Sequence, residues 1–187
     1  MRRVFSSALK RGPVAPDVLA GVLDASTAID SDYELAELLV QIARLQPLDA
    51  RTRAPFLKAL TSVESDYECR RVVSAVVKAD PSPDTLATML DPSLAIDSDY
   101  EQASFLIDVA KSQSIDGALR APFFKGVETL SSSFERGRVL QAVVKGGTLP
   151  QETLVAVLRS TASMTSGHEA SQVLLTVAAT QKLSGEP

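Results

Sequence analysis

The chain has few of the residues from which metal sites, disulfides and catalytic centres are built. Its 187 residues include one cysteine, Cys69, and one histidine, His168. A single cysteine excludes an internal disulfide and a cysteine-based metal cluster, and a single histidine excludes a multi-histidine metal site. The His-Glu-x-x-His motif of metallopeptidases is absent for the same reason. We interpret Cys69 as a small buried or half-buried side chain and His168 as part of a helix start.

Several longer patterns are also missing. No apolar run approaches membrane-spanning length, and the apolar part of residues 3–10 is too short for a signal peptide. Lysine and arginine are scattered and the net charge is −4, which disfavours nucleic-acid binding. Neither the Gly-x-Ser-x-Gly turn of a serine hydrolase nor a glycine-rich phosphate loop occurs. We therefore expect no enzyme activity, no cofactor, no nucleic-acid partner and no direct insertion into a membrane.

The chain is instead organised around one short motif that occurs five times. The segment Ala-Ile-Asp-Ser-Asp-Tyr-Glu stands at 28–34 and returns unchanged at 95–101. A partial copy lies between them at 65–68, and two altered copies follow at 132–135 and 166–169. Counted at the tyrosine position, the copies stand at 33, 67, 100, 134 and 168, so the step between them is nearly constant. A fixed period of about 34 residues indicates a stack of similar structural units.

Every copy reads Ser-x-x-Glu before an apolar run, which is the capping-box signature of a helix N-terminus. We expect the serine hydroxyl to accept a hydrogen bond from the glutamate amide. In the reciprocal bond, the glutamate carboxylate would accept from the serine amide. The aspartate after the serine (Asp32, Asp66 and Asp99) adds negative charge in the first turn, where the helix dipole favours it. The motif therefore predicts five helix starts.

The acidic residues at 30–34 and 97–101 also admit a cation-binding interpretation. They alternate along the chain as the ligands of an EF-hand loop do. Such a loop needs a glycine at its sixth position, where this chain has Leu35 or Gln102. Because a helical pattern has already begun there, we prefer the helix cap and expect no metal ion.

The residues after each motif follow the same plan. Apolar residues at helical spacing come first, and a second helical pattern begins after a break rich in proline or glycine. The segment Arg-Ala-Pro-Phe at 53–56 returns at 120–123, an offset of two motif periods, so the full unit is two helix pairs long. Residues 70–78 are rich in valine and have strand propensity, but their position after a motif favours a helix.

These patterns predict an all-α fold. We expect a right-handed α-solenoid of about eleven antiparallel helices, in helix pairs of about 34 residues each. One pair cannot bury its apolar stripe alone, so neighbouring pairs must share a core. We expect a single solenoid domain over residues 1–182 and a polar tail at 183–187. The domain begins within a repeat, because residues 3–10 match residues that follow the second and fourth motifs.

The motif resembles a known kind of repeat. The pattern Ile-x-Ser-Asp-Tyr-Glu, then Leu-Leu and Ala, then a second helix with Arg and Phe, resembles the HEAT-like α-solenoid repeats of bacteria. It looks most like the Ser-Asp-Tyr-Glu repeats found beside membrane-anchored sensor proteins and peptidases of the BlaR type. The resemblance covers nearly the whole chain and implies an accessory, protein-binding module. Nothing in the chain matches a peptidase.

We therefore expect a non-catalytic scaffold that binds a protein or peptide along its curved surface. The alternative is a regulatory or sensor segment of a larger membrane-anchored bacterial signalling protein or peptidase. Four basic residues recur in register and would face one groove suited to an acidic partner segment: Arg53, Lys58, Arg120 and Lys125. A solvated surface without a binding role is the simpler explanation of these residues, and we prefer it.

Aromatic residues also recur, at the second helical position of each unit. Tyr33, Tyr67 and Tyr100, with Phe134, form either an exposed ladder that binds a partner or packing contacts with the preceding helix. We prefer the packing contacts, which would seal the junction between repeats. Two further pairs have the three-residue spacing of intrahelical ion pairs: Glu68 with Arg71, and Glu135 with Arg138.

Overall fold

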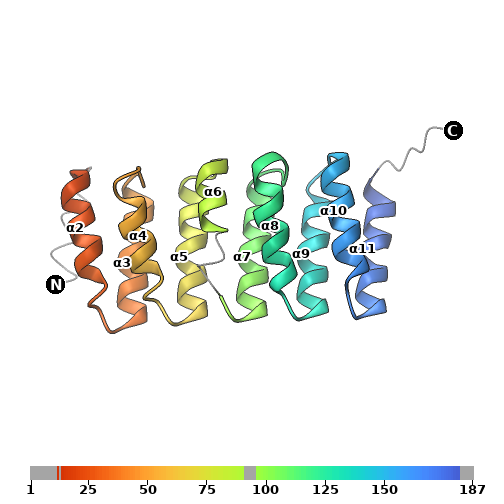
Figure 1. Cartoon of the computed structure of the whole chain (residues 1–187), viewed down its shortest axis with the longest axis horizontal. Helices are drawn as coiled ribbons and strands as arrows, with labels where there is room; N and C mark the ends of the chain where they lie inside the picture. Colours follow the sequence, from red (N-terminus) through yellow and green to blue (C-terminus); the bar gives the residue numbers. More distant parts are fainter. Residues whose placement is uncertain (1–11, 13, 91–95, 182–187) are drawn as a thin grey trace. The chain divides into compact units, whose positions relative to one another are not determined.

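The structure, a computed structural model, describes residues 12, 14–90 and 96–181 (Figure 1). Over these residues it contains ten α-helices and no strand, which confirms the all-α prediction. Residues 3–10 and the tail at 183–187 lie outside the described residues. The chain divides into two compact units, one of residues 1–80 with 93–96 and one of residues 81–92 with 97–187. A single domain over residues 1–182 stays a prediction.

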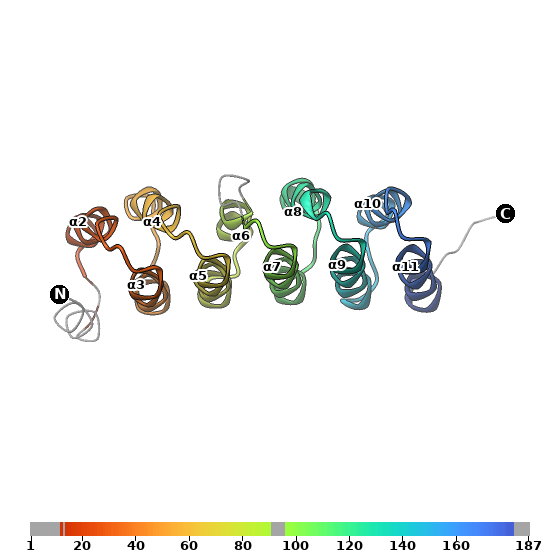
Figure 2. The ribbon, with the colours of Figure 1, turned by 90° about the horizontal axis from the view of Figure 1, so that it is seen from below.

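The first unit holds four helices in two layers. They are α2 (Pro16–Ser26), α3 (Asp32–Leu45), α4 (Arg53–Leu60) and α5 (Asp66–Ala79). In one layer α3 packs beside α5, and in the other α2 packs beside α4 (Figure 2). The two layers meet where α3 contacts α4.

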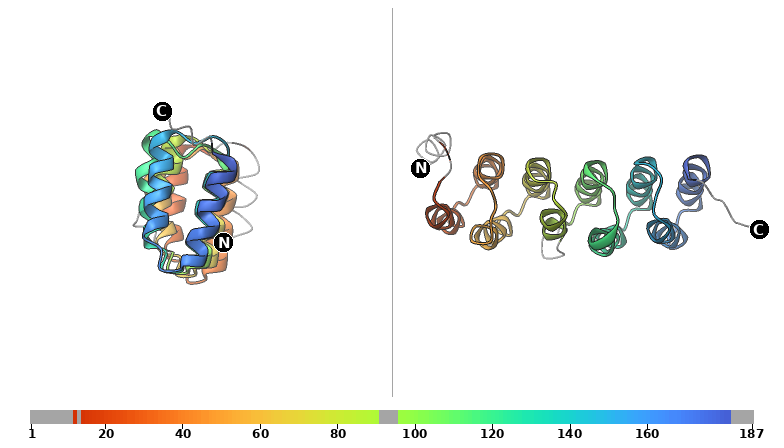
Figure 3. Two further views of the ribbon diagram at one scale, coloured as in Figure 1. Left: turned by 90° about the vertical axis from the view of Figure 1, so that its right-hand side faces the viewer. Right: turned by 90° about the horizontal axis from the view of Figure 1, so that it is seen from above.

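The second unit holds six helices, also in two layers. They are α6 (Pro83–Met89), α7 (Asp99–Ser112), α8 (Gly117–Thr129), α9 (Ser133–Lys145), α10 (Gln151–Ala162) and α11 (Gly167–Thr180). In one layer α9 lies between α7 and α11, and in the other α8 lies between α6 and α10 (Figure 2 and Figure 3). We call α3, α5, α7, α9 and α11 the box helices, because they begin at the five motifs. The remaining five are the intervening helices.

Each box helix begins at the serine of its motif. The serine Oγ accepts a hydrogen bond of 3.3 to 3.4 Å from the backbone amide of the glutamate three residues later. This bond satisfies one of the amides that a helix start leaves without a partner inside the helix. The predicted caps are confirmed at Ser31, Ser65, Ser98, Ser132 and Ser166.

The predicted return bond from the glutamate is wrong in two motifs. The Ser65 amide donates to the Asp32 carboxylate at 2.7 Å, and the Ser132 amide donates to Asp99 at 2.7 Å. Each carboxylate also accepts the amide of the residue before that serine, at 3.2 and 3.0 Å. The aspartate at the start of one box helix therefore binds the start of the next box helix. We call this contact the aspartate clamp.

The glutamates of the same two motifs are buried and bind arginines one turn further on. Glu68 lies 2.5 Å from Arg71, and Glu135 lies 2.5 Å from Arg138. These bonds confirm the predicted intrahelical pairs. They also explain the missing return bond, because a buried carboxylate is stabilised more by a guanidinium than by a backbone amide.

Apolar side chains fill the core between the layers of each unit. Phe56 in α4 and Phe123 in α8, which stand at equivalent places in the two copies of Arg-Ala-Pro-Phe, are both fully buried. The valine-rich residues 70–78 lie within α5, as predicted despite their strand propensity. Ser65 caps this helix and its valines are buried, so capping and packing decide the conformation.

Two intervening helices, α4 and α8, begin without a side-chain cap bond. Thr52 precedes α4, but its side chain makes no cap bond. The Asp49 carboxylate instead accepts the backbone amides of Arg51 and Thr52, at 2.9 and 3.0 Å. The bonds from Thr52 and Arg51 hold the pKa of Asp49 below its ordinary value. In α8, the helix begins at Gly117, whose φ of +47° favours glycine, and Pro122 therefore lies inside the helix.

Buried glutamines tie the ends of two box helices to a preceding loop. The Gln181 side chain, at the end of α11, donates to the Gly147 carbonyl at 2.9 Å and accepts the amide of Leu149 at 2.8 Å. Gln46, at the end of α3, makes the equivalent two bonds with residues 12 and 14. The loop before α10 is thereby held by α11, which fixes one side of the groove described below.

Candidate functional site

The basic residues selected from the sequence lie on intervening helices, and ion pairs account for two of them. Lys58 on α4 lies 3.2 Å from Asp24 on α2, and Arg120 on α8 lies 2.5 Å from Glu152 on α10. These bridges join neighbouring helices of one layer. Arg53 is half-buried and Lys125 is exposed. Each unit holds two of the four residues, and one of the two is paired with a carboxylate in each case.

The tyrosines lie on box helices, in the other layer of each unit. Tyr33, Tyr67 and Tyr100 are 51, 52 and 57% exposed, and Phe134 is 57% exposed. The preferred prediction, that each ring packs on the preceding helix and seals the junction, does not fit this exposure. Three of the rings contact arginines instead. They present a half-exposed aromatic surface at the start of the box helices.

Arg71 on α5 is held by two rings and two carboxylates. Its guanidinium lies 6.0 Å from the ring centroids of both Tyr33 and Tyr67, within cation–π range. It binds Glu68 on the same helix and Glu37 on α3. The hydrogen bond to Glu37 is the largest cause of the raised pKa of Arg71. Two carboxylates more than balance the charge of this arginine, so it is a link between α3 and α5 and not an anion site.

Arg138 holds the equivalent position on α9 with fewer partners. It binds Glu135 at 2.5 Å and lies 5.5 Å from the ring centroid of Tyr100. The position on α7 that corresponds to Glu37 holds Ser104, so α7 has no carboxylate to match the second partner of Arg71. Less of the positive charge of Arg138 is therefore compensated.

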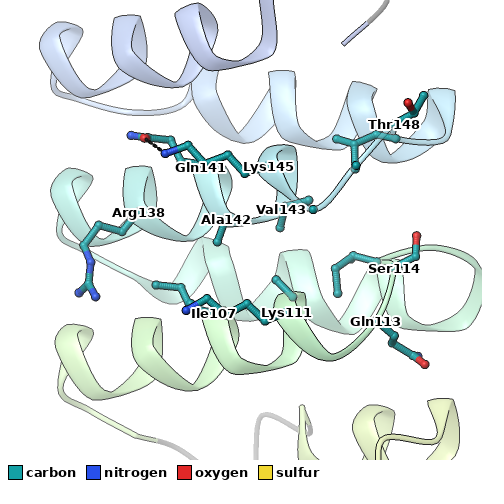
Figure 4. Close-up of a pocket in the computed structure, with 15 residues that line it drawn as sticks. Ile107, Lys111, Gln113, Ser114, Arg138, Gln141, Ala142, Val143, Lys145 and Thr148 are labelled. Atoms are coloured by element: carbon teal, nitrogen blue, oxygen red, sulfur yellow. Dashed lines mark hydrogen bonds between the residues drawn. The ribbon is translucent and has the colours of Figure 1, made fainter. Parts of the chain in front are cut away.

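A groove of about 720 Å³ begins beside Arg138 and runs between α7 and α9 (Figure 4). Figure 4 shows Ile107 and Lys111 on α7 facing α9, with Arg138 at one end. The loops at 113–115 and 146–149 close the other end. Apolar side chains form much of its lining: Ile107, Ala110, Ile115, Ala142, Val143 and Leu149.

The charged side chains that line this groove are all basic. They are Lys111, Arg138 and Lys145, and no aspartate or glutamate of the described chain is among the lining residues. Lys145 Nζ donates to Gln141 Oε1 at 3.5 Å, and neither lysine forms an ion pair with a described carboxylate. Both lysines stand in the last turn of their helices, where the dipole favours a positive charge. We call this site the basic groove.

Lys111 and Lys145 are not among the four basic residues that the sequence placed on one groove. The sequence does contain a pattern that includes both lysines, because Arg44 and Lys78 stand two motif periods before Lys111 and Lys145. Arg44 and Lys78 are exposed near the ends of α3 and α5. A basic residue in the last turn of consecutive box helices is the pattern that would have pointed to this groove.

The single cysteine and the single histidine lie apart from the basic groove, on α5 and α11. Cys69 is buried, and burial, with the nearby charge of Asp66, raises the pKa of its thiol to about 11. His168 is exposed at the start of α11, consistent with a role in the helix start.

The described residues contain no group of three or more possible metal ligands. None of the helices in the described part of the chain has the length and apolar character needed to cross a membrane.

Comparison with known proteins gives no match, so the function is inferred from the geometry of the site. No protein-family model matches the chain, and neither a curated protein nor a solved structure matches it.

Proposed function

We propose that the chain is a non-catalytic helical-repeat protein whose box-helix layer binds an acidic segment of a protein partner. In this proposal the helix pairs are antiparallel and stack as a right-handed, HEAT-like α-solenoid. The recurrence of the motif supports the repeat. So do the aspartate clamps and glutamine bonds, which join residues 32 to 34 positions apart. Stacks of this kind present extended surfaces that bind other proteins.

The observation that carries the binding proposal is the composition of the basic groove. Lys111, Arg138 and Lys145 converge on an apolar lining in a protein whose net charge is −4. An extended segment with alternating acidic and aliphatic side chains fits this combination. Its carboxylates would pair with the lysines, and its aliphatic groups would contact residues such as Ile107 and Val143. The half-exposed Tyr100 ring, which contacts Arg138, extends the same surface.

Fluorescence anisotropy tests this proposal. The probes are a labelled peptide of alternating Glu and Leu and its counterpart with Gln in place of Glu. We expect the acidic peptide to bind and the Gln peptide to bind at least about tenfold more weakly, with an affinity that falls as salt is added. Lys111→Glu/Lys145→Glu should weaken binding of the acidic peptide by at least about tenfold.

The matched control is Lys125→Glu/Arg159→Glu, which makes the same charge change on α8 and α10, outside the groove. It should leave binding within about twofold of wild type, because screened charges at a distance contribute little. Equal loss in both double variants would show a non-specific charge effect and overturn the proposal. So would tight binding of the acidic peptide by Lys111→Glu/Lys145→Glu.

A further inference from the structure

The three cations of the basic groove have counterparts on α3 and α5, two motif periods earlier in the chain. They are Arg44 for Lys111, Arg71 for Arg138 and Lys78 for Lys145. In the first unit α3 packs beside α5, as α7 packs beside α9 in the second. Arg44 and Lys78 are exposed in the last turns of their helices, and neither forms an ion pair with a described residue.

The apolar and aromatic parts of the groove are repeated in the same register. Both half-exposed rings of the first unit, Tyr33 and Tyr67, lie 6.0 Å from the Arg71 guanidinium, as the Tyr100 ring lies beside Arg138. We call the face formed by α3 and α5 the first-unit face. Five of the six apolar positions that line the basic groove have apolar counterparts on it: Val40, Ala43, Leu48, Ala75 and Val76.

The two faces differ at one position beside the central arginine. Arg71 binds one carboxylate on its own helix and a second, Glu37, on α3. Arg138 binds one carboxylate on its own helix, and Ser104 on α7 stands where α3 has Glu37. Three cations against one bound carboxylate leave two positive charges in the basic groove. Three cations against two leave one positive charge on the first-unit face.

We propose that the first-unit face is a second site for acidic segments, and that Glu37 makes it weaker than the basic groove. The inference rests on the proposed function, because it gives the first unit the same class of ligand. Carboxylates of the segment would pair with Arg44 and Lys78, which are exposed and have no ion-pair partner, but would compete with Glu37 for Arg71. Attraction of an acidic ligand rises with the positive charge of the face, so the residue at position 37 or 104 determines the affinity.

Anisotropy of the labelled Glu/Leu peptide tests the second site once Lys111→Glu/Lys145→Glu has disabled the basic groove. In that background we expect residual binding, at least about tenfold weaker than in wild type. Adding Glu37→Ser, which gives α3 the residue of α7, should strengthen the residual binding at least about fivefold. Unfolding cannot produce such a gain.

The matched control is Asp17→Ser in the same background. It removes one negative charge from an exposed residue of α2, in the other layer of the first unit, and should change binding by less than about twofold. Arg44→Glu/Lys78→Glu, added to the Glu37→Ser variant, should abolish the gain. Circular dichroism melts show that this last variant is folded.

The two proposals fail in different ways. Equal peptide affinity in wild type and Lys111→Glu/Lys145→Glu refutes the basic groove and leaves the first-unit face to be judged by Glu37→Ser alone. No gain from Glu37→Ser, a gain as large from Asp17→Ser, or a gain that survives Arg44→Glu/Lys78→Glu would each overturn the second site. In the otherwise wild-type chain Ser104→Glu should weaken binding at least about threefold, because it offers Arg138 a second carboxylate.

Discussion

The Asp32 carboxylate accepts the backbone amide of Ser65 at 2.7 Å, across 33 residues of chain. It accepts the Glu64 amide as well, at 3.2 Å. One side chain thereby accepts hydrogen bonds from two backbone amides at the turn before α5. These bonds connect the start of α3 to the start of α5. The same residue that favours its own helix through the dipole also determines where the next box helix begins.

Replacing this carboxylate should destabilise the first unit. We expect Asp32→Ala to lower the free energy of unfolding by about 1–3 kcal/mol, because two amides lose a charged acceptor. Asp32→Asn keeps one acceptor oxygen and should cost less. Urea unfolding followed by circular dichroism measures both. Asp30→Ala, at an exposed residue of the same motif, is the control and should stay within about 0.5 kcal/mol of wild type. Equal losses at both positions would contradict the clamp.

Arg71 and Arg138 occupy equivalent positions but should differ in their contribution to stability. Arg71→Ala leaves the carboxylates of Glu37 and Glu68 without their guanidinium, so we expect a loss of about 2–3 kcal/mol. Arg138→Ala affects one carboxylate and one ring, and about 1 kcal/mol is expected. Arg71→Lys should not restore wild-type stability, because one ammonium cannot span both carboxylates. The check is the midpoint of chemical unfolding for the three variants.

Lowering the pH should remove the contribution of Asp99 to the stability of the fold. Burial of this carboxyl opposes ionisation, but hydrogen bonds from the Ser131 side chain and from the Ser131 and Ser132 amides outweigh burial and lower the pKa of Asp99. A lowered folded pKa means that the contribution is complete above the unfolded value of about 3.9 and is lost as pH falls through the folded value. The stability difference between wild type and Asp99→Asn should therefore be constant above about pH 5 and shrink below about pH 4. A constant difference down to about pH 2 would contradict this assignment.

Gln181, at the end of α11, should contribute more to stability than the exposed residues of the same helix. Gln181→Ala removes the bonds to Gly147 and Leu149 and leaves two part-buried backbone groups without these partners. We expect a loss of about 1–3 kcal/mol by urea unfolding. Gln172→Ala, on the exposed side of the same helix, should change stability by less than about 0.5 kcal/mol. A neutral Gln181→Ala would show that this loop holds its conformation without the glutamine.

The thiol of Cys69 should resist modification while the chain is folded. Its pKa of about 11 leaves little thiolate at neutral pH, and its side chain is buried. We expect Ellman's reagent to react slowly in neutral buffer and fast after denaturation. The ratio of the two rates measures the protection. A folded-state rate close to that of the denatured chain would contradict the burial of this residue.

The helix starts could be predicted from the sequence because capping is a local interaction. Ser31 and Glu34 are three residues apart, and their bond depends on little outside that turn. The partner of Asp32 could not be predicted in the same way, since it depends on which helix packs beside α3. The favourable interaction of Asp32 with the dipole of its own helix already explained an aspartate at this position. Nothing in the motif therefore pointed to a bond with a distant residue.

The candidate site was harder to predict for a related reason. A repeated basic residue is equally consistent with a bridge to a neighbouring helix, as at Lys58, and with a place in a groove, as at Lys145. The difference lies in whether a carboxylate stands opposite on the adjacent helix. That depends on the register between helices, which spacing within one segment does not reveal. The exposure of the tyrosines was missed because an amphipathic ring suits a surface as well as a junction.

The bonds of the aspartate clamps and buried glutamines each close a loop of 32 to 34 residues. A chain whose contacts are this near in sequence has a low contact order, and little loop entropy is lost before each helix meets its neighbour. Folding can then nucleate at neighbouring box helices within either unit and spread along that unit. Among the described helices α11 packs beside one box helix and α9 beside two, so the amides of α11 should exchange with solvent before those of α9.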